Sequence, residues 1–542
     1  MKFLVDPFTE GLKPRAGENN SLGKRVLEGA IWMSAAQLLA RTSGSIRIIV
    51  LAAILSQHEL GLFGIALIVL QLIERLSDTG MRQALIQSPK EIGDIEKGTA
   101  WVSQITRGIG LGTVLFFFAG TAEAFFEKPG VAELLVWLAI VPVIQGLSNI
   151  GVVHLNRELR FRKLVLLDLA KALFDLVFSV TFAWFFPIAL SLVYGKICGT
   201  ICTLVITFFI DPRWAKFRFS FHSFRSLYTF GFWIFMSAIL SFIMIRGGDL
   251  VIGKLLETTD LSIYQVAYSL ACIPIMGVMS VFAKTTFPAF SRMQEDQDRL
   301  ASVFLRVFAL TGFTAMLSIA GMVALGSDFT SLCFRPEYAS VATLLPVLAV
   351  WGSCRAMGAA NSVIFQAIGK PALATVFQFL MLGMFIVILI PATKYYGTVG
   401  LAISLAVIGV TAQIGRYLVI ARVLKVTLKA VLSRALLPVV LASVTWAVTT
   451  LVLTLIHEQS HLLRFVTGLC VVLTTYGIGS IWLDHRFQFG LLSFVENRLP
   501  RKLLSLTHAI GLSGKSTTST SCLLYTSPSP RDLSTSRMPS SA

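Results

Sequence analysis

The sequence predicts an all-α polytopic membrane protein with about fourteen transmembrane helices. Twelve of them are expected to form two six-helix lobes related by a pseudo-twofold axis along the membrane normal, followed by two extra C-terminal helices. Hydrophobic residues make up 55% of the chain, charged residues only 14%, and the mean hydropathy is +0.76. Soluble domains carry roughly 25% charged residues. Apolar stretches of about 20 residues, the length that crosses a bilayer, recur along the whole chain, and an internal repeat divides them into halves.

Each expected span is an apolar stretch bounded by glycine, proline or charged residues. Pro187, Pro212 and Gly397 are examples of such boundaries. The fourteen spans cover residues 30–55, 61–81, 99–120, 131–153, 164–186, 188–210, 230–255, 262–283, 303–325, 340–365, 372–393, 398–421, 435–456 and 462–483.

Basic residues alternate strongly between the two sides of these spans. Thirty lie on one side, and the five on the other are Lys128, Lys254, Arg335, Lys394 and Arg464. Cytoplasmic loops carry the excess of Lys and Arg, so both termini are predicted to be cytoplasmic. The net charge of +17 therefore indicates membrane orientation. A nucleic-acid partner is not expected, because no basic patch is interleaved with aromatic residues.

The spans divide the chain into consecutive regions. The last region is Ser/Thr-rich and resembles vector read-through, with a natural disordered tail as the alternative. The regions are a cytoplasmic N-terminal segment (1–29), an N-lobe (30–210), a cytoplasmic linker (211–229), a C-lobe (230–421), two further spans (435–483), a cytoplasmic C-terminal segment (484–513) and the tail (514–542).

An internal repeat with an offset of 201 residues supports the two lobes. Residues 55–63 align with 256–264, and the alignment pairs Glu59 with Asp260 and Phe63 with Tyr264. The repeat returns after six spans, and an even number of crossings gives both halves the same orientation. Such a parallel repeat predicts a substrate path between the two halves.

Ionisable residues inside the spans are the best candidates for function, because each is costly unless it faces water or a partner. The first helices of the two halves carry cations at similar depth. We expect them to line a partly cationic cavity that attracts an anionic substrate. Structural ion pairing, for example of Arg246 with Asp249, and snorkelling near span ends are the alternatives. The cavity candidates are Arg47, Arg246, Asp249, Arg41, Arg107 and Arg355, with Lys196 as a further intramembrane cation.

Span 5 carries Asp168, Lys171 and Asp175, whose spacing of three and four places them on one helix face. A self-neutralising structural triad is one interpretation, and a carboxylate poised for ion coupling is the other. Glu74 and Arg75 end span 2 and are expected near the cytoplasmic interface.

No cofactor or metal site is predicted. The seven cysteines form no CxxC pair. His457 and His461 lie in a short outer loop without acidic or cysteine partners. The chain has no P-loop, so an ion gradient, the membrane potential or the substrate gradient, and not ATP, is expected to drive the function. No catalytic residues are predicted.

Several short motifs occur in order along residues 22–490. They are Gly29–Trp32, Glu59–Phe63, Asp78–Gln87, Asn156–Phe161, Asp249–Lys254, Tyr264–Tyr268 and Phe287–Arg292. Together they resemble the polysaccharide transporter family, which contains the Wzx-type flippases and belongs to the multidrug/oligosaccharidyl-lipid/polysaccharide exporter superfamily. The resemblance implies alternating access and an undecaprenyl-pyrophosphate-linked oligosaccharide as cargo. Membrane lipid and the polysaccharide polymerase and chain-length machinery are the other implied partners, in a bacterial inner membrane.

Other function classes remain as alternatives. A lipid II flippase would also have fourteen spans and intramembrane arginines. A multidrug or cation antiporter of the same superfamily would favour a carboxylate-lined cavity. A glycan polymerase or ligase would be an enzyme, and the absence of a long outer loop disfavours it, because the longest is about 326–339.

Overall fold

The structure is a computed structural model. It describes residues 43–44, 46–77, 93–157, 160–210, 220, 239–240, 242–292, 297–367, 370–456 and 458–487, all of which belong to one compact unit. Within these ranges the chain is almost entirely helical, which confirms the predicted class. Seven helices of the described part are long and apolar enough to cross a membrane. The count of fourteen spans and the two-lobe division stay predictions.

The first half begins with helical residues 46–54. The Ser56 side chain then caps the next helix by accepting the Glu59 N–H at 3.3 Å. Predicted span 4 is not one helix, because it breaks at Ala139 and ends at Gly146. The helices are α3 (Gln57–Leu76), α5 (Asp94–Phe126), α6 (Val131–Leu138), α7 (Ile140–Gly146), α8 (Val152–Arg157), α9 (Phe161–Phe185) and α10 (Ala189–Ile210).

The second half begins with helical residues 242–255. Gly397 has φ 61° and ψ −146°, which interrupts α16 at the predicted boundary between spans 11 and 12. The elements are α12 (Thr258–Arg292), α13 (Gln297–Cys333), the 3₁₀ helix η3 (Pro336–Ser340), α14 (Val341–Ala367), α15 (Pro371–Met384), the π-helix η4 (Phe385–Leu389), α16 (Ile390–Val423), α17 (Leu428–Leu455) and α18 (His461–Phe487).

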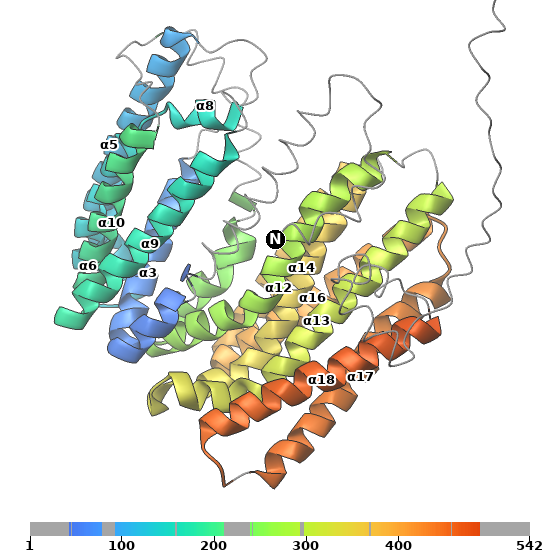
Figure 1. Cartoon of the computed structure of the whole chain (residues 1–542). Helices are drawn as coiled ribbons and strands as arrows, with labels where there is room; N and C mark the ends of the chain where they lie inside the picture. The colour runs from blue at the N-terminus through green and yellow to red at the C-terminus, as the bar shows by residue number, and fades with distance from the viewer. Residues whose placement is uncertain are drawn as a thin grey trace, which may run out of the picture. The chain divides into compact units, whose positions relative to one another are not determined.

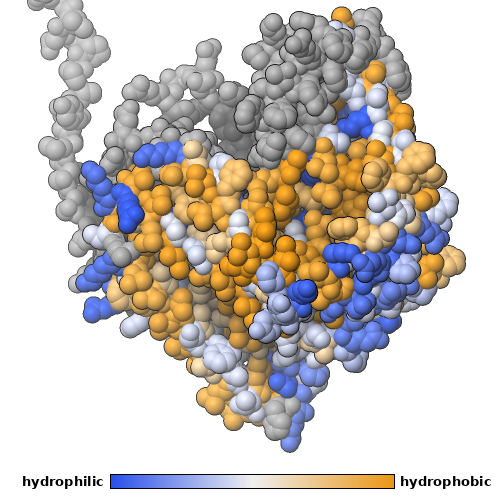
Figure 2. Space-filling model, turned by 180° about the vertical axis from the view of Figure 1, so that it is seen from behind, coloured by the Kyte–Doolittle hydropathy of each residue, from blue (hydrophilic) through white to orange (hydrophobic). Residues whose placement is uncertain are grey.

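Neighbouring helices pack in antiparallel pairs, such as α9 with α10 and α17 with α18 (Figure 1). Their outward surfaces are strongly apolar. Figure 2 shows a broad hydrophobic area across the face seen from behind. Large side chains such as Phe209 (82% exposed) and Leu455 (77% exposed) stand on the outside of the bundle. Surfaces of this kind are stable against lipid and not against water.

The two copies of the internal repeat meet in the structure. Helix α3 begins at Gln57 and α12 at Thr258, which are 201 residues apart, as in the sequence repeat. His58 Nδ1 lies 2.8 Å from Thr258 Oγ1. Gly61 packs so closely on the Thr258 carbonyl that a Cβ atom there would overlap it. We name this end of the bundle, where α3 and α12 begin, the joint end.

Ion pairs tie a loop of the first half to the second half at the joint end. Lys128 Nζ lies 3.2 Å from Glu257 Oε2, and Lys254 Nζ lies 2.7 Å from Glu127 Oε1. Lys254 also donates to the Phe125 carbonyl at 2.6 Å. These contacts are called the ionic clasp.

A second set of contacts runs in the opposite direction at the same end. From the loop before α14, Arg335 donates to the Ile54 carbonyl at 3.3 Å, and Gln57 donates to the Glu337 carbonyl at 2.7 Å. These contacts are called the neutral clasp. In both clasps, the loop after the third span of one half holds the joint between the first two spans of the other. The clasps therefore follow the internal repeat.

Candidate functional site

A cavity of 750 Å³ lies among α3, α5, α7, α9, α10 and helical residues 242–246. On α3, the residues from Leu60 to Leu70 belong to the apolar core, whereas Gln71 and Glu74 line the cavity. On α10, Leu192 and Val193 are in the core and Thr200 lines the cavity. The cavity therefore occupies the part of the bundle remote from the joint end, and the core fills the part near it.

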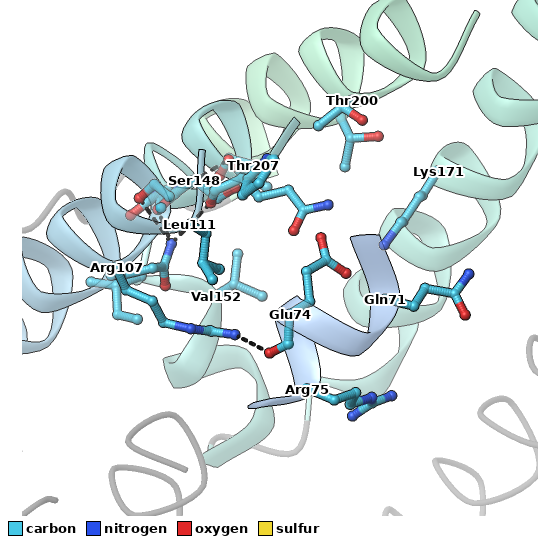
Figure 3. Close-up of a pocket in the computed structure, with 18 of the residues that line it drawn as sticks. Gln71, Glu74, Arg75, Arg107, Leu111, Ser148, Val152, Lys171, Thr200 and Thr207 are labelled. Carbon is cyan, nitrogen blue, oxygen red and sulfur yellow. Dashed lines mark hydrogen bonds between the residues drawn. The ribbon is translucent and has the colours of Figure 1, made fainter. Parts of the chain in front are cut away.

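The cavity lining is unusually charged for a membrane protein. Its carboxylates are Glu74, Asp168 and Asp175. Its cations are Arg75, Arg107, Lys171 and Arg246. Figure 3 shows Lys171 from α9 and Glu74 from α3 directed toward the same space. Charges at this depth need water or polar partners, so the lining describes a hydrated chamber with a small excess of positive charge.

Arg246 is held on two sides while it lines the cavity. Its Nε donates to Gln71 Oε1 at 3.1 Å, and its Nη1 donates to Asp249 Oδ2 at 3.3 Å. The Asp249 side chain is 4% exposed, whereas that of Arg246 is 34% exposed. Arg246 therefore has the ion pair with Asp249 that the sequence suggested as a structural role. It also lines the cavity, as the functional interpretation expected.

Arg47 lies behind the cavity wall, beside a carboxylate. Asp175 Oδ2 is 4.0 Å from Arg47 Nη1 and 2.7 Å from Lys196 Nζ. Asp175 itself lines the cavity. One carboxylate on α9 therefore serves two cations from different helices.

The remaining candidates have separate environments. Arg107 lines the cavity and donates to the Glu74 carbonyl at 2.8 Å and to Ser77 Oγ at 2.9 Å. Arg355 contacts the phenol oxygen of Tyr268, away from this cavity. Arg41 lies outside the described residues.

Asp168, Lys171 and Asp175 all line the cavity from α9. Asp175 pairs across to α10 and to the first helix instead of with Lys171. Lys171 forms no ion pair within the described part of the chain. The three residues share a helix face that lines the cavity, and both interpretations of them stay predictions.

Sequence reasoning missed the uncharged polar lining. Thr200, Thr203 and Thr207 repeat at spacings of three and four on α10 and all line the cavity. Their hydroxyls donate to carbonyls of their own helix, at 2.7, 2.8 and 2.6 Å. Thr207 Oγ1 also accepts from the Asn149 N–H at 3.2 Å. This threonine row in an otherwise apolar span was the available signal.

Gln104 stabilises the cavity wall where predicted span 4 ends. Its amide nitrogen donates to the carbonyls of Gln145 and Gly146 at 3.1 Å and to that of Ser148 at 3.2 Å. Backbone that leaves the helix within a membrane protein is tolerated where it is buried in protein or lines an aqueous cavity. The interrupted helix thus marks the same chamber as the charges. In the described ranges, no group of three His, Cys, Asp or Glu side chains is placed to hold a metal.

Known proteins resemble this chain in sequence and in fold. The lipopolysaccharide biosynthesis protein WzxC of Escherichia coli (strain K12) is 23% identical over 404 residues, covering 74% of this chain and 82% of WzxC. The solved structure of the lipid II flippase MurJ in an inward closed conformation superposes with a TM-score of 0.69 at 16% identity, covering 84% of this chain and 99% of MurJ.

A multidrug resistance MATE family transporter in an inward-facing conformation superposes with a TM-score of 0.60 at 12% identity, covering 71% of this chain and 96% of the transporter. These structures show a shared fold. A family model described as polysaccharide biosynthesis protein matches residues 50–343, more than half of the chain. This chain belongs to the polysaccharide biosynthesis protein family.

Proposed function

We propose that the chain is a flippase that moves undecaprenyl-pyrophosphate-linked oligosaccharide repeat units across the inner membrane for surface polysaccharide biosynthesis. The observation that carries this proposal is the charged, polar cavity enclosed by apolar helices, with four cations and three carboxylates in its lining. Membership of the polysaccharide biosynthesis family and the likeness to WzxC support the same substrate class. The chain would act as a transporter and break no covalent bond.

The lining suits both parts of the proposed head group. Guanidinium groups bind phosphate through paired hydrogen bonds, and an ammonium acts as a point charge. Arg246 and Lys171 supply one group of each kind. Sugar hydroxyls donate hydrogen bonds, and the hydroxyl oxygens of Thr200 and Thr203 on α10 offer acceptors. The carrier's prenyl chain would remain in lipid.

Alternating access would use twelve of the fourteen predicted spans as two lobes, 30–210 and 230–421. The excess of basic residues on one side supports an orientation with the joint end toward the periplasm. In that orientation, the described state would open its cavity to the cytoplasm. The structure also supplies a reason for most basic residues on the predicted outer side. Lys128, Lys254 and Arg335 belong to the clasps, and Arg464 lies 3.4 Å from the buried Asp328 carboxylate.

Orientation can be measured with single cysteines introduced at two exposed loop positions, Gln459→Cys and Lys425→Cys. In a variant without native cysteines, we expect the thiol at position 459 to react with a membrane-impermeant maleimide in intact cells. The thiol at position 425 should react only after permeabilisation. Denatured samples provide the control for thiol reactivity. Labelling of position 425 from outside intact cells contradicts the orientation.

Substrate class can be tested by depleting the chain from its own cells. Undecaprenyl-pyrophosphate-linked oligosaccharide should accumulate severalfold and surface polysaccharide should fall, because the carrier cannot deliver its cargo. Re-expression of the wild-type chain is the control. Unchanged oligosaccharide-lipid pools would refute the proposed function.

A lipid II flippase is the second candidate, because the MurJ fold covers 84% of this chain. Both substrates carry a pyrophosphate, so the cavity charges do not separate them. Accumulation of lipid II in the depleted cells, with unchanged oligosaccharide-lipid pools, would favour this candidate. An antiporter would leave both lipid pools unchanged.

A further inference from the structure

Asp175 is the cavity-lining carboxylate that lies beside two buried cations. It lines the cavity from α9, and its Oδ2 atom lies between two cations, 2.7 Å from Lys196 Nζ and 4.0 Å from Arg47 Nη1. The side chains of all three residues are 16–19% exposed. Arg47 and Lys196 thus form a small cationic site, and the anion that it holds is the protein's own Asp175 carboxylate.

One carboxylate satisfies neither all the hydrogen-bond donors nor all the positive charge of Arg47 and Lys196. The Arg47–Asp175 separation exceeds hydrogen-bond distance, and the buried Arg47 Nε has no hydrogen-bond partner in the described residues. A guanidinium carries five donors. Two cations and one carboxylate also leave one positive charge uncompensated within the group.

A pyrophosphate would satisfy this site better than a carboxylate does. It offers more acceptor oxygens and more negative charge, and the paired geometry of guanidinium with phosphate is favourable. We propose that Asp175 is an internal stand-in for the substrate: the pyrophosphate displaces its carboxylate from Arg47 and Lys196 on binding, and the carboxylate returns when the lipid leaves. This inference rests on the proposed transport of a pyrophosphate-linked lipid.

The displaced carboxylate has an alternative partner on its own helix. Lys171 lies four residues earlier, on the same face of α9. It lines the cavity and forms no ion pair within the described part of the chain. Asp175 can therefore exchange Lys196 and Arg47 for Lys171 by side-chain rotation, without moving the helix.

An internal competitor serves a transporter in two ways. Two buried cations without a counter-ion would destabilise the substrate-free protein, and Asp175 prevents this. The carboxylate also lowers the apparent affinity for the substrate, because only the fraction of molecules with a displaced carboxylate binds. A carrier that must release its cargo benefits from this reduction.

The proposal can be tested by anion binding to the purified full-length chain in nanodiscs, with farnesyl pyrophosphate as the probe and calorimetry as the readout. Asp175→Asn should bind the probe about tenfold more tightly than the wild type, because the competitor is removed. Glu133→Gln is the control, since it removes one negative charge at an exposed position on α6 that does not line the cavity. It should change the affinity by less than about twofold. Adding Arg47→Ala to Asp175→Asn should abolish the gain.

Asp175→Asn leaves two buried cations unpaired and can fail to fold. The double variant Asp175→Asn/Lys196→Gln keeps the net charge of the wild type and still frees Arg47, so it should retain part of the gain. Equal gains in affinity in Asp175→Asn and Glu133→Gln, or no gain in the double variant, overturn the inference. Either result leaves the proposed function intact, because that function is judged independently by the lipid pools of depleted cells.

Discussion

Replacing Arg246 by alanine is expected to abolish polysaccharide export while the protein stays in the membrane at normal amounts. Arg246 faces the cavity and is positioned by Gln71 and Asp249. Its Nη2 takes part in neither of these two bonds. Loss of a buried charge contact costs about 2–5 kcal/mol, and about 1.4 kcal/mol corresponds to tenfold. We therefore expect transport to fall by a factor on the order of 100.

Two further variants separate binding from folding. Arg246→Ala leaves the buried Asp249 carboxylate without its partner, which alone can destabilise the chain. Arg246→Ala/Asp249→Asn removes that unpaired charge and should still lack export. Arg246→Lys should keep part of the activity, because an ammonium retains the charge but loses the planar pair of donors.

Arg422 provides the matched control, because it is an exposed arginine in the last turn of α16 and does not line the cavity. Arg422→Ala should export normally. Membrane abundance by immunoblot and surface polysaccharide are the two measurements. Normal export by the Arg246→Ala variant would show that Arg246 does not bind the substrate.

The helical framework could be predicted from the sequence because the bilayer imposes a length. About 20 apolar residues are needed for each crossing, and glycine or proline marks the ends. The predicted boundary at Gly397 is visible in its left-handed backbone. The offset of 201 residues also locates the starts of α3 and α12. Both predictions depend on local sequence or on simple repetition.

The partners of the intramembrane charges could be predicted only in part. Arg246 and Asp249 are three residues apart on one helix, so their contact follows from helix geometry. Asp175 could reach Lys171 by the same rule, yet it pairs with Lys196, 21 residues away on α10. Which helices become neighbours depends on the packing of the whole bundle. For the same reason, the sequence positions of Lys128 and Lys254 predicted the side of the membrane on which they lie. They could not predict their ion pairs with Glu257 and Glu127.

The ionic clasp is too weak to test by simple charge removal. Glu257 and Glu127 are 75% and 77% exposed, and exposed ion pairs contribute about 0–1 kcal/mol each. The hydrogen bond and the charge of Lys254 lower the pKa of the Glu127 carboxyl, so this pair persists well below neutral pH. Single substitutions such as Lys254→Ala should change transport only slightly. A contact of this strength suits a gate that opens in every cycle.

A covalent link across the same contact should have a large effect. In a variant without native cysteines, Glu127→Cys/Lys254→Cys treated with a short bifunctional methanethiosulfonate should lose nearly all lipid-linked oligosaccharide transport in vesicles. The reason is that, under the proposed alternating access, the joint end would have to separate for the cavity to open on that side, and the link would hold it closed. Dithiothreitol should restore transport, since it cleaves the link. Each single-cysteine variant, treated identically, controls for modification without cross-linking. Full transport by the cross-linked protein would show that these two loops stay together throughout the cycle, and the joint end would then not be the gate.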